Sequence, residues 1–139
     1  RMFAEQLAAA RKVPLRIEAD LRELHFGEWE GRNAAEILFE DEQALGQFWT
    51  DPYAYTPPAG EPVRDFANRV LGAVARLSEE LAGQRVLIVT HGGVMRLLLA
   101  RARGLPEAQL LQVEVPHASL MSLRCVAGEL SEVAPCRLS

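Results

Sequence analysis

The chain contains the sequence Val86-Leu87-Ile88-Val89-Thr90-His91-Gly92-Gly93, and this stretch decides the fold. Its first four residues are apolar without alternation, which is typical of a strand buried on both faces of a parallel sheet. Two glycines follow, and a helical pattern then runs to Gly104, just before a proline. We therefore expect a strand in the interior of the sheet, with helices on both of its faces.

The end of this strand is also the strongest candidate for a site. In open parallel α/β sheets, ligands bind beyond the carboxyl ends of the strands, and His91 lies at that end. We expect the Gly92 and Gly93 amides to open toward a cleft at the start of the helix, where an anion such as phosphate binds well. His91 would add a donor or a positive charge. A tight turn with a structural histidine is the alternative that the spacing leaves open.

The segments on either side alternate between helical and extended patterns. Helical patterns occupy three further segments: 1–12, where an apolar stripe predicts a packed helix, 34–49, which Asn33 can cap, and 61–82. Strand or extended patterns occupy another three: 15–19, 120–126 and 130–133. Helices and strands in this order favour an α/β layer fold.

Length and composition favour one folded domain. The 139 residues are 49% hydrophobic and 24% charged, which is ordinary globular usage. A net charge of −4 lacks the basic excess that nucleic-acid binding needs, so we expect no nucleic acid as a partner. No apolar run approaches the roughly 20 residues of a membrane span, so we expect no membrane association. The two cysteines, Cys125 and Cys136, provide no disulfide framework, which fits a reducing cytoplasm.

The loop 23–31 is the second candidate region, because its two glycines and mixed charges follow no regular period. Glu23 in this loop could serve as a general acid or base, although most loop glutamates are only solvated. Spacing alone predicts surface or structural roles for two other histidines, His25 and His117. It predicts a solvated polar face for three arginines of the helix at 61–82: Arg64, Arg69 and Arg76. No spacing typical of metal ligands occurs, so we expect no metal.

Several motifs together carry a family resemblance. They are Leu21-Arg22-Glu23-Leu24-His25-Phe26-Gly27-Glu28-Trp29-Glu30-Gly31, then Gly60-Glu61 with Asp65-Phe66 and Arg69-Val70, then Val89-Thr90-His91-Gly92-Gly93-Val94, and Gly104-Leu105-Pro106. In this order the chain resembles the histidine phosphatase superfamily, also called phosphoglycerate mutase-like. Within it, the likeness is greatest to the bacterial α-ribazole phosphatases of cobalamin biosynthesis. The resemblance implies a three-layer α/β fold with a mostly parallel central sheet.

The resemblance also implies roles for four residues. Glu23 matches the acid that protonates the leaving oxygen and later helps to activate water. His91 matches the histidine that binds the transferring phosphoryl group, assisted by the Gly92 amide. Glu61 matches a region that lies over the substrate. The implied reaction needs no cofactor and removes phosphate from a small phosphorylated metabolite, with α-ribazole 5′-phosphate as the leading candidate; a homodimer is left open.

The chain departs from the family pattern at its start. The Arg-His-Gly motif, whose histidine becomes phosphohistidine, is absent from residues 1–139. Phe3-Ala4 matches the first helix of the family, but Arg1 falls too late to match the arginine that precedes it, and Pro62 replaces a small hydroxyl residue. We therefore expect a single domain that is truncated at its N-terminus, lacks its first strand and is inactive by itself. The alternative is a non-catalytic module that binds a phosphate ligand or another protein.

Overall fold

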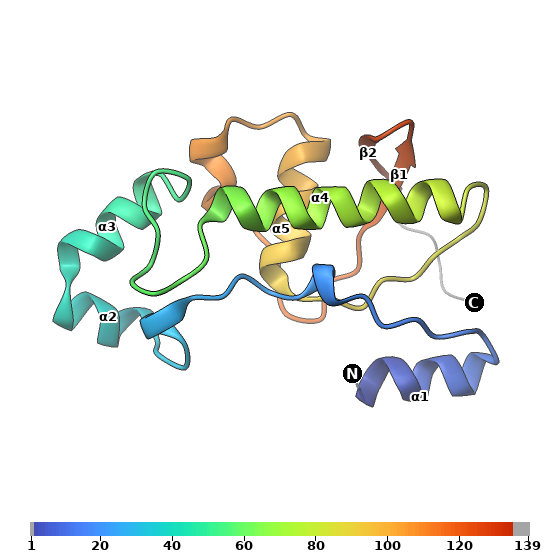
Figure 1. The fold of residues 1–139 in the computed structure, drawn as a ribbon, viewed down its shortest axis with the longest axis horizontal. Helices are drawn as coiled ribbons and strands as arrows, with labels where there is room; N and C mark the ends of the chain where they lie inside the picture. The colour runs from blue at the N-terminus through green and yellow to red at the C-terminus, as the bar shows by residue number, and fades with distance from the viewer. Residues whose placement is uncertain (1, 135–139) are drawn as a thin grey trace.

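A computed structural model describes residues 2–134 of the chain (Figure 1). Arg1 and Cys136 lie outside the described residues. The long helix α4, Val63–Glu80, runs through the middle of the molecule, and α5, Gly92–Ala102, crosses and contacts it. Both helices were expected from their apolar spacing.

The core forms where α4 and α5 face one another. Val70 and Val94 are fully buried there, and Phe66 and Leu97 are nearly so. Apolar side chains three and four residues apart fall on one face of a helix, which is why each helix offers a continuous apolar stripe to the other. This core is the support on which the loops of the candidate site rest.

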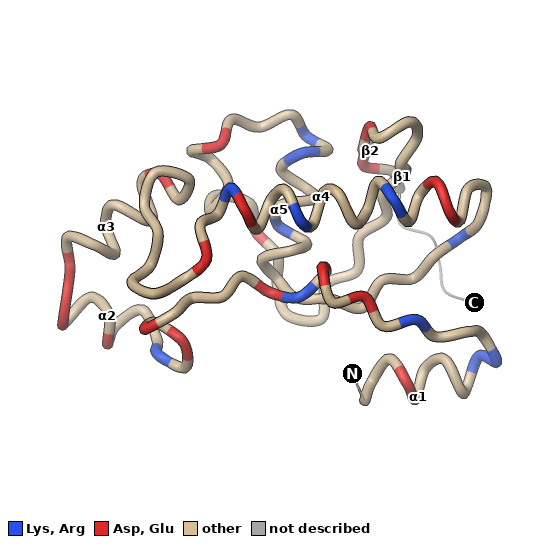
Figure 2. Tube along the Cα trace, viewed as in Figure 1, with Lys and Arg blue, Asp and Glu red and all other residues tan. Residues whose placement is uncertain are grey.

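The single helix expected at 34–49 is divided into two helices in the structure. Residues 34–49 form α2, Ala34–Glu40, and α3, Glu42–Thr50, because Asp41 leaves the helical conformation at φ −151° and ψ 80°. Its Oδ1 accepts a hydrogen bond of 3.0 Å from the Ala44 amide, so Asp41 ends one helix and caps the next. Asn33 caps α2 as predicted, accepting from the Glu36 amide at 2.9 Å. The two helices form one end of the molecule, where acidic residues prevail (Figure 2).

The two late strands are confirmed. β1, Ser122–Val126, and β2, Glu129–Val133, form an antiparallel hairpin in which Ser122 lies opposite Val133. The hairpin contacts both α4 and α5. Three short 3₁₀ turns complete the regular structure: η1, Ala19–Leu21, η2, Gly27–Trp29, and η3, Glu107–Gln112. Within residues 2–134 this hairpin is the only sheet.

The expected interior strand at 86–89 is not formed. The segment is extended, but it belongs to no sheet, and its four apolar side chains are 38–52% exposed. The physical reason is that no described segment pairs with its backbone, and an extended chain becomes a strand only through such pairing. The parallel sheet expected from the sequence is therefore absent from residues 2–134.

The first helix also differs from the expectation. α1, Met2–Arg11, forms where its residues predict it, but Ala8 is the only buried residue within Met2–Arg11. Phe3, which begins the predicted apolar stripe, is 64% exposed. Figure 1 shows α1 at the edge of the molecule, followed by the extended stretch that leads to η1. No helix among residues 2–134 combines the length and the apolar character of a membrane span.

Candidate active site

Glu23 lies against the first turn of α5. Its Oε2 accepts a hydrogen bond of 3.0 Å from the Gly93 amide, and its Oε1 accepts one of 3.0 Å from the Leu24 amide. A carboxylate is well placed at a helix N-terminus, because the unpaired amides and the helix dipole both favour negative charge. The structure thus brings Glu23 together with the Thr90–Gly93 turn, across about seventy residues of sequence.

Gly93 is required by this contact. A Cβ atom at Gly93 would overlap the Glu23 carboxylate, so any side chain here displaces that group. At Gly92, by contrast, a Cβ would meet nothing within 4 Å. The sequence predicts two amides open toward an anion, but the Gly93 amide donates to Glu23 instead.

His91 is the N-cap residue of α5, with extended backbone at φ −108° and ψ 162°, and its side chain is exposed. The preceding residue fixes its place: Thr90 Oγ1 donates a 2.7 Å hydrogen bond to the Leu21 carbonyl. Leu21 stands two residues before Glu23, so this bond ties the turn before α5 to the loop that carries the carboxylate. His91 and Glu23 therefore belong to one cluster of loops.

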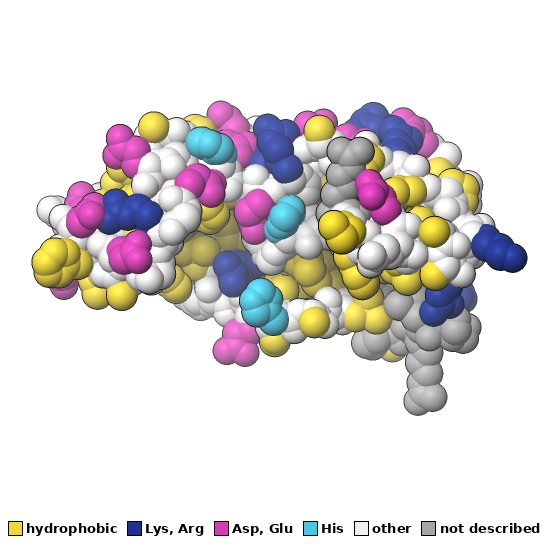
Figure 3. Space-filling view, turned by 90° about the horizontal axis from the view of Figure 1, so that it is seen from below, with side chains coloured by type: hydrophobic (Ala, Val, Ile, Leu, Met, Phe, Trp, Pro, Cys, Tyr) yellow, Lys and Arg dark blue, Asp and Glu magenta, His cyan; other side chains and the backbone are white. Residues whose placement is uncertain are grey.

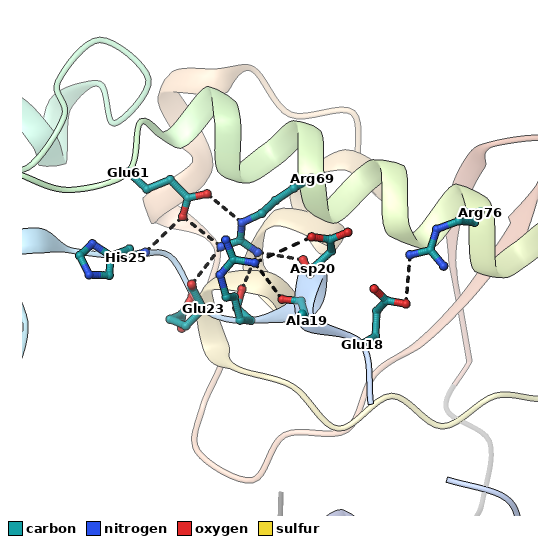
Figure 4. Close-up of polar contacts among 9 residues, drawn as sticks. Glu18, Ala19, Asp20, Glu23, His25, Glu61, Arg69 and Arg76 are labelled. Atoms are coloured by element: carbon teal, nitrogen blue, oxygen red, sulfur yellow. Dashed lines mark hydrogen bonds and ion pairs between the residues drawn. The ribbon is translucent and has the colours of Figure 1, made fainter. Parts of the chain in front are cut away.

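Glu61 lies just before α4, and its side chain pairs with an arginine of that helix. Its carboxylate forms a bidentate ion pair with Arg69, at 2.8 Å from Nε to Oε1 and 3.0 Å from Nη2 to Oε2. It also accepts a 3.3 Å hydrogen bond from the His25 amide (Figure 4). Burial alone would raise the pKa of Glu61, but the hydrogen bonds from Arg69 and the His25 amide outweigh burial and hold the pKa below its usual value.

Two loops meet to bring Glu61 to this place. The Glu61 amide donates to the His25 carbonyl at 2.8 Å, and the Glu28 amide donates to the Pro58 carbonyl at 2.8 Å. Gly27 makes the approach possible: it has φ +61°, and a Cβ there would overlap the backbone of Pro58 and Ala59. The turn at Gly27 thus lets the Glu23 loop pack closely against the segment before α4.

Arg69 is the residue that sequence reasoning missed. Its spacing predicts a solvated helix face, yet its side chain is only 12% exposed. Its guanidinium donates to the carbonyls of Asp20, Arg22 and Glu23 at 2.8, 2.9 and 3.0 Å. The only signal in the sequence is its place in the Arg69-Val70 motif, because its carbonyl partners lie 46–49 residues away.

The other two arginines of α4 form ion pairs closer to the surface. Arg64 donates from Nη2 to both Glu107 oxygens, at 2.9 and 3.1 Å, and lies over the Tyr53 ring. Arg76 pairs with Glu18 at 3.0 Å. Their side chains are 60% and 40% exposed, so the expected polar face holds for them better than for Arg69.

The face seen in Figure 3 is hollowed between the α2–α3 end and the centre of the molecule. Hydrophobic side chains line the hollow, and histidine, acidic and basic side chains lie around its rim. An apolar cavity of about 230 Å³ lies among Phe26, Trp29, Ile37, Leu45 and Phe48, and neither Glu23 nor His91 lines it. Among residues 2–134, no cluster of His, Cys, Asp and Glu side chains is arranged to hold a metal ion.

Comparison with known proteins agrees with the motifs. The model of the histidine phosphatase superfamily, branch 1, matches residues 1–134. The chain belongs to the histidine phosphatase superfamily. Its α/β, phosphoglycerate mutase-like fold class is that of the solved structures which it matches, so the fold class expected from the sequence is confirmed.

Three proteins illustrate where the chain lies within the histidine phosphatase superfamily. Adenosylcobalamin/alpha-ribazole phosphatase of Salmonella typhimurium is 35% identical over 128 residues, covering 92% of this chain and 63% of that protein. Bacillus stearothermophilus YhfR matches with a TM-score of 0.83 and 32% identity, over 94% of this chain and 65% of its own. The alpha-ribazole phosphatase from Shigella flexneri matches with a TM-score of 0.76 and 30% identity, over 95% and 65%. The chain spans less than two thirds of each of these proteins.

Proposed function

We propose that the protein carrying this chain is a cytoplasmic phosphomonoesterase that acts through a phosphohistidine on a small phosphorylated metabolite, with α-ribazole 5′-phosphate as the substrate. The observation that carries the proposal is the contact between the Glu23 carboxylate and the Gly93 amide, two residues after His91. It holds the Glu23 carboxylate, our proposed proton donor, at the helix N-terminus that begins after His91. Membership of the superfamily and the match to alpha-ribazole phosphatases support the reaction and the substrate.

In this mechanism, each residue of the site has a separate task. His91, with the Gly92 amide, binds the phosphoryl oxygens and stabilises the charge that spreads over them. Glu23 protonates the ribose oxygen as the P–O bond breaks, and later takes a proton from the water that attacks the phosphohistidine. The nucleophilic histidine forms the intermediate and is released when that water cleaves the N–P bond. Residues 1–139 contain no Arg-His-Gly motif, so we place this nucleophile elsewhere in the full-length protein.

His91→Ala in the full-length protein tests the proposal. We expect the variant to lose vanadate inhibition and to hydrolyse α-ribazole 5′-phosphate at least about 10²-fold more slowly, because the phosphoryl group loses a hydrogen-bond donor. The measurements are phosphate release and the vanadate inhibition constant. The matched control is His117→Ala, which removes another exposed histidine, one to which the mechanism assigns no task. Unchanged vanadate binding in His91→Ala would leave only the structural-turn interpretation, and a full-length protein that binds vanadate without turnover would favour the non-catalytic module.

A further inference from the structure

Arg69 uses all of its hydrogen-bonding capacity inside the protein. A guanidinium carries five N–H donors, and in the structure five acceptors surround it. Nε and Nη2 bind the two Glu61 oxygens, Nη1 binds the Asp20 and Arg22 carbonyls, and Nη2 also binds the Glu23 carbonyl. Figure 4 shows these bonds converging from α4 on the loop below it. No donor is left for a substrate anion, so Arg69 does not act by binding phosphate.

The carbonyls that Arg69 binds belong to the backbone on which the Glu23 side chain is mounted. Arg69 binds the carbonyls of Arg22 and Glu23 directly, and it binds that of Asp20 within η1. The Glu23 carboxylate lies at the other end of its side chain, on the Gly93 amide. A small shift of the loop backbone therefore moves the carboxylate away from the first turn of α5.

Glu61 extends the same hold to the residues after Glu23. Its carboxylate binds the His25 amide and its own amide binds the His25 carbonyl, while its charge compensates that of Arg69. The loop is thus fixed on both sides of Glu23 by one nearly buried ion pair, whose side chains are 12% and 15% exposed. Bidentate arginine–carboxylate pairs combine strength with a defined geometry, and lysine cannot reproduce that geometry.

We propose that Arg69, with Glu61 as its counter-ion, is a positioning residue that holds Glu23 in place for proton transfer to the leaving oxygen. This inference rests on the proposed function, in which Glu23 is the proton donor. It gives Glu61 a role through Arg69 and the loop instead of the contact with substrate that the resemblance implies. Because misplacement of a catalytic group by about 1 Å can cost about 10²-fold in rate, the hold on the loop has consequences for turnover.

The test is Arg69→Lys in the full-length protein, measured with two substrates. Hydrolysis of α-ribazole 5′-phosphate needs a proton on a poor leaving group, whereas hydrolysis of p-nitrophenyl phosphate barely needs one. We expect Arg69→Lys to lower kcat about 10-fold or more on the first substrate and clearly less on the second. Arg64→Lys is the matched control, because Arg64 also lies on α4 and pairs with a glutamate, Glu107, but has no hydrogen bond to the Glu23 loop. We expect this control to change neither rate by more than about twofold.

A double variant separates positioning from general structural support. If Arg69 acts through Glu23, Arg69→Lys added to Glu23→Gln causes no further selective loss on α-ribazole 5′-phosphate. Equal losses on the two substrates, or an undiminished selective loss in the Glu23→Gln background, would overturn the proposal. Should Arg69→Lys fail to fold, Glu61→Gln serves as the test instead, and the loss of kcat is again compared between the two substrates. If Glu23→Gln alone slows both substrates equally, the acid role of Glu23 fails. If Glu23→Gln slows α-ribazole 5′-phosphate selectively but Arg69→Lys does not, only the positioning role of Arg69 is removed.

Discussion

Glu61 links the stability of the molecule to pH at the scale of a single residue. Its pKa is held below the usual value in the folded protein: burial acts to raise it, and the hydrogen bonds from Arg69 and the His25 amide outweigh burial. A carboxyl group with a depressed pKa stabilises the folded state above its unfolded pKa, near 4.3. That stabilisation is lost as the pH falls through the lower, folded value.

We therefore predict that Glu61→Gln lowers the free energy of unfolding by about 1.5–3 kcal/mol at pH 7, the usual contribution of hydrogen bonds to a charged group. The difference from the unchanged protein should shrink as the pH falls below about 4. Urea unfolding at several pH values measures both effects. Glu79→Gln, an exposed position on the same helix, is the control and should change stability by no more than about 0.5 kcal/mol. A loss that stays constant down to acidic pH would separate Glu61 from the pH effect.

Local patterns predict elements well where a helix or hairpin supplies its own hydrogen bonds. The stripe of α4 and the glycine between β1 and β2 are of this kind, and both elements form as expected. Expectations fail where the outcome depends on distant partners. Residues 86–89 have the composition of a strand but no paired neighbour within residues 2–134, and Asp41 prefers to cap α3 instead of continuing α2.

The candidate site divides in the same way. Motifs identify Glu23, His91 and the glycines, because the chemistry requires those residue types. Arg69 could not be recognised from its surroundings in the sequence, since its polar spacing on α4 resembles that of Arg64 and Arg76, and its carbonyl partners come from another loop. Backbone acceptors carry no residue identity, so they leave no trace in a sequence pattern.

The junction between α5 and the Glu23 loop gives a prediction for an element. Gly93→Ala places a methyl group where the Glu23 carboxylate lies, and the carboxylate must swing away because it is the flexible partner. We expect turnover of α-ribazole 5′-phosphate to fall about 10-fold or more, while the free energy of unfolding changes by less than about 1 kcal/mol. Steady-state kinetics and urea unfolding of the full-length protein test both parts.

Gly72→Ala is the matched control for Gly93→Ala. Gly72 lies within α4, where a Cβ meets nothing within 4 Å. Alanine should stabilise that helix by about 0.5–1 kcal/mol and leave turnover unchanged. If Gly93→Ala retained full turnover, the Glu23–Gly93 contact would have no part in the reaction.

At the scale of the whole molecule, two extended apolar segments are uncovered. Val13, Leu15 and Ile17 are 44–60% exposed, and residues 86–89 are exposed as well. Exposed, unpaired, apolar backbone is a template for pairing with another chain. We expect the 139-residue chain by itself to associate as its concentration rises and to bind hydrophobic dyes.

We predict that Ile88→Lys reduces this association several-fold, because a charge in the segment opposes edge-to-edge pairing. Sedimentation velocity over a range of concentrations measures it. Val126→Lys, an equally drastic change at an exposed residue of β1, is the control and should leave association close to that of the unchanged chain. Equal effects of both substitutions would show that net charge, and not the 86–89 segment, governs association.

The central claim, that Glu23 protonates the leaving group at the start of α5, is tested most directly by a leaving-group series. The measurement is kcat/KM of the full-length protein and of its Glu23→Gln variant for alkyl and aryl phosphates of graded leaving-group acidity. We predict a shallow dependence for the unchanged protein and a steep one for Glu23→Gln, with a loss of about 10²-fold or more for α-ribazole 5′-phosphate and the smallest loss for p-nitrophenyl phosphate. Two parallel dependences, with the same loss for every ester, would contradict the claim.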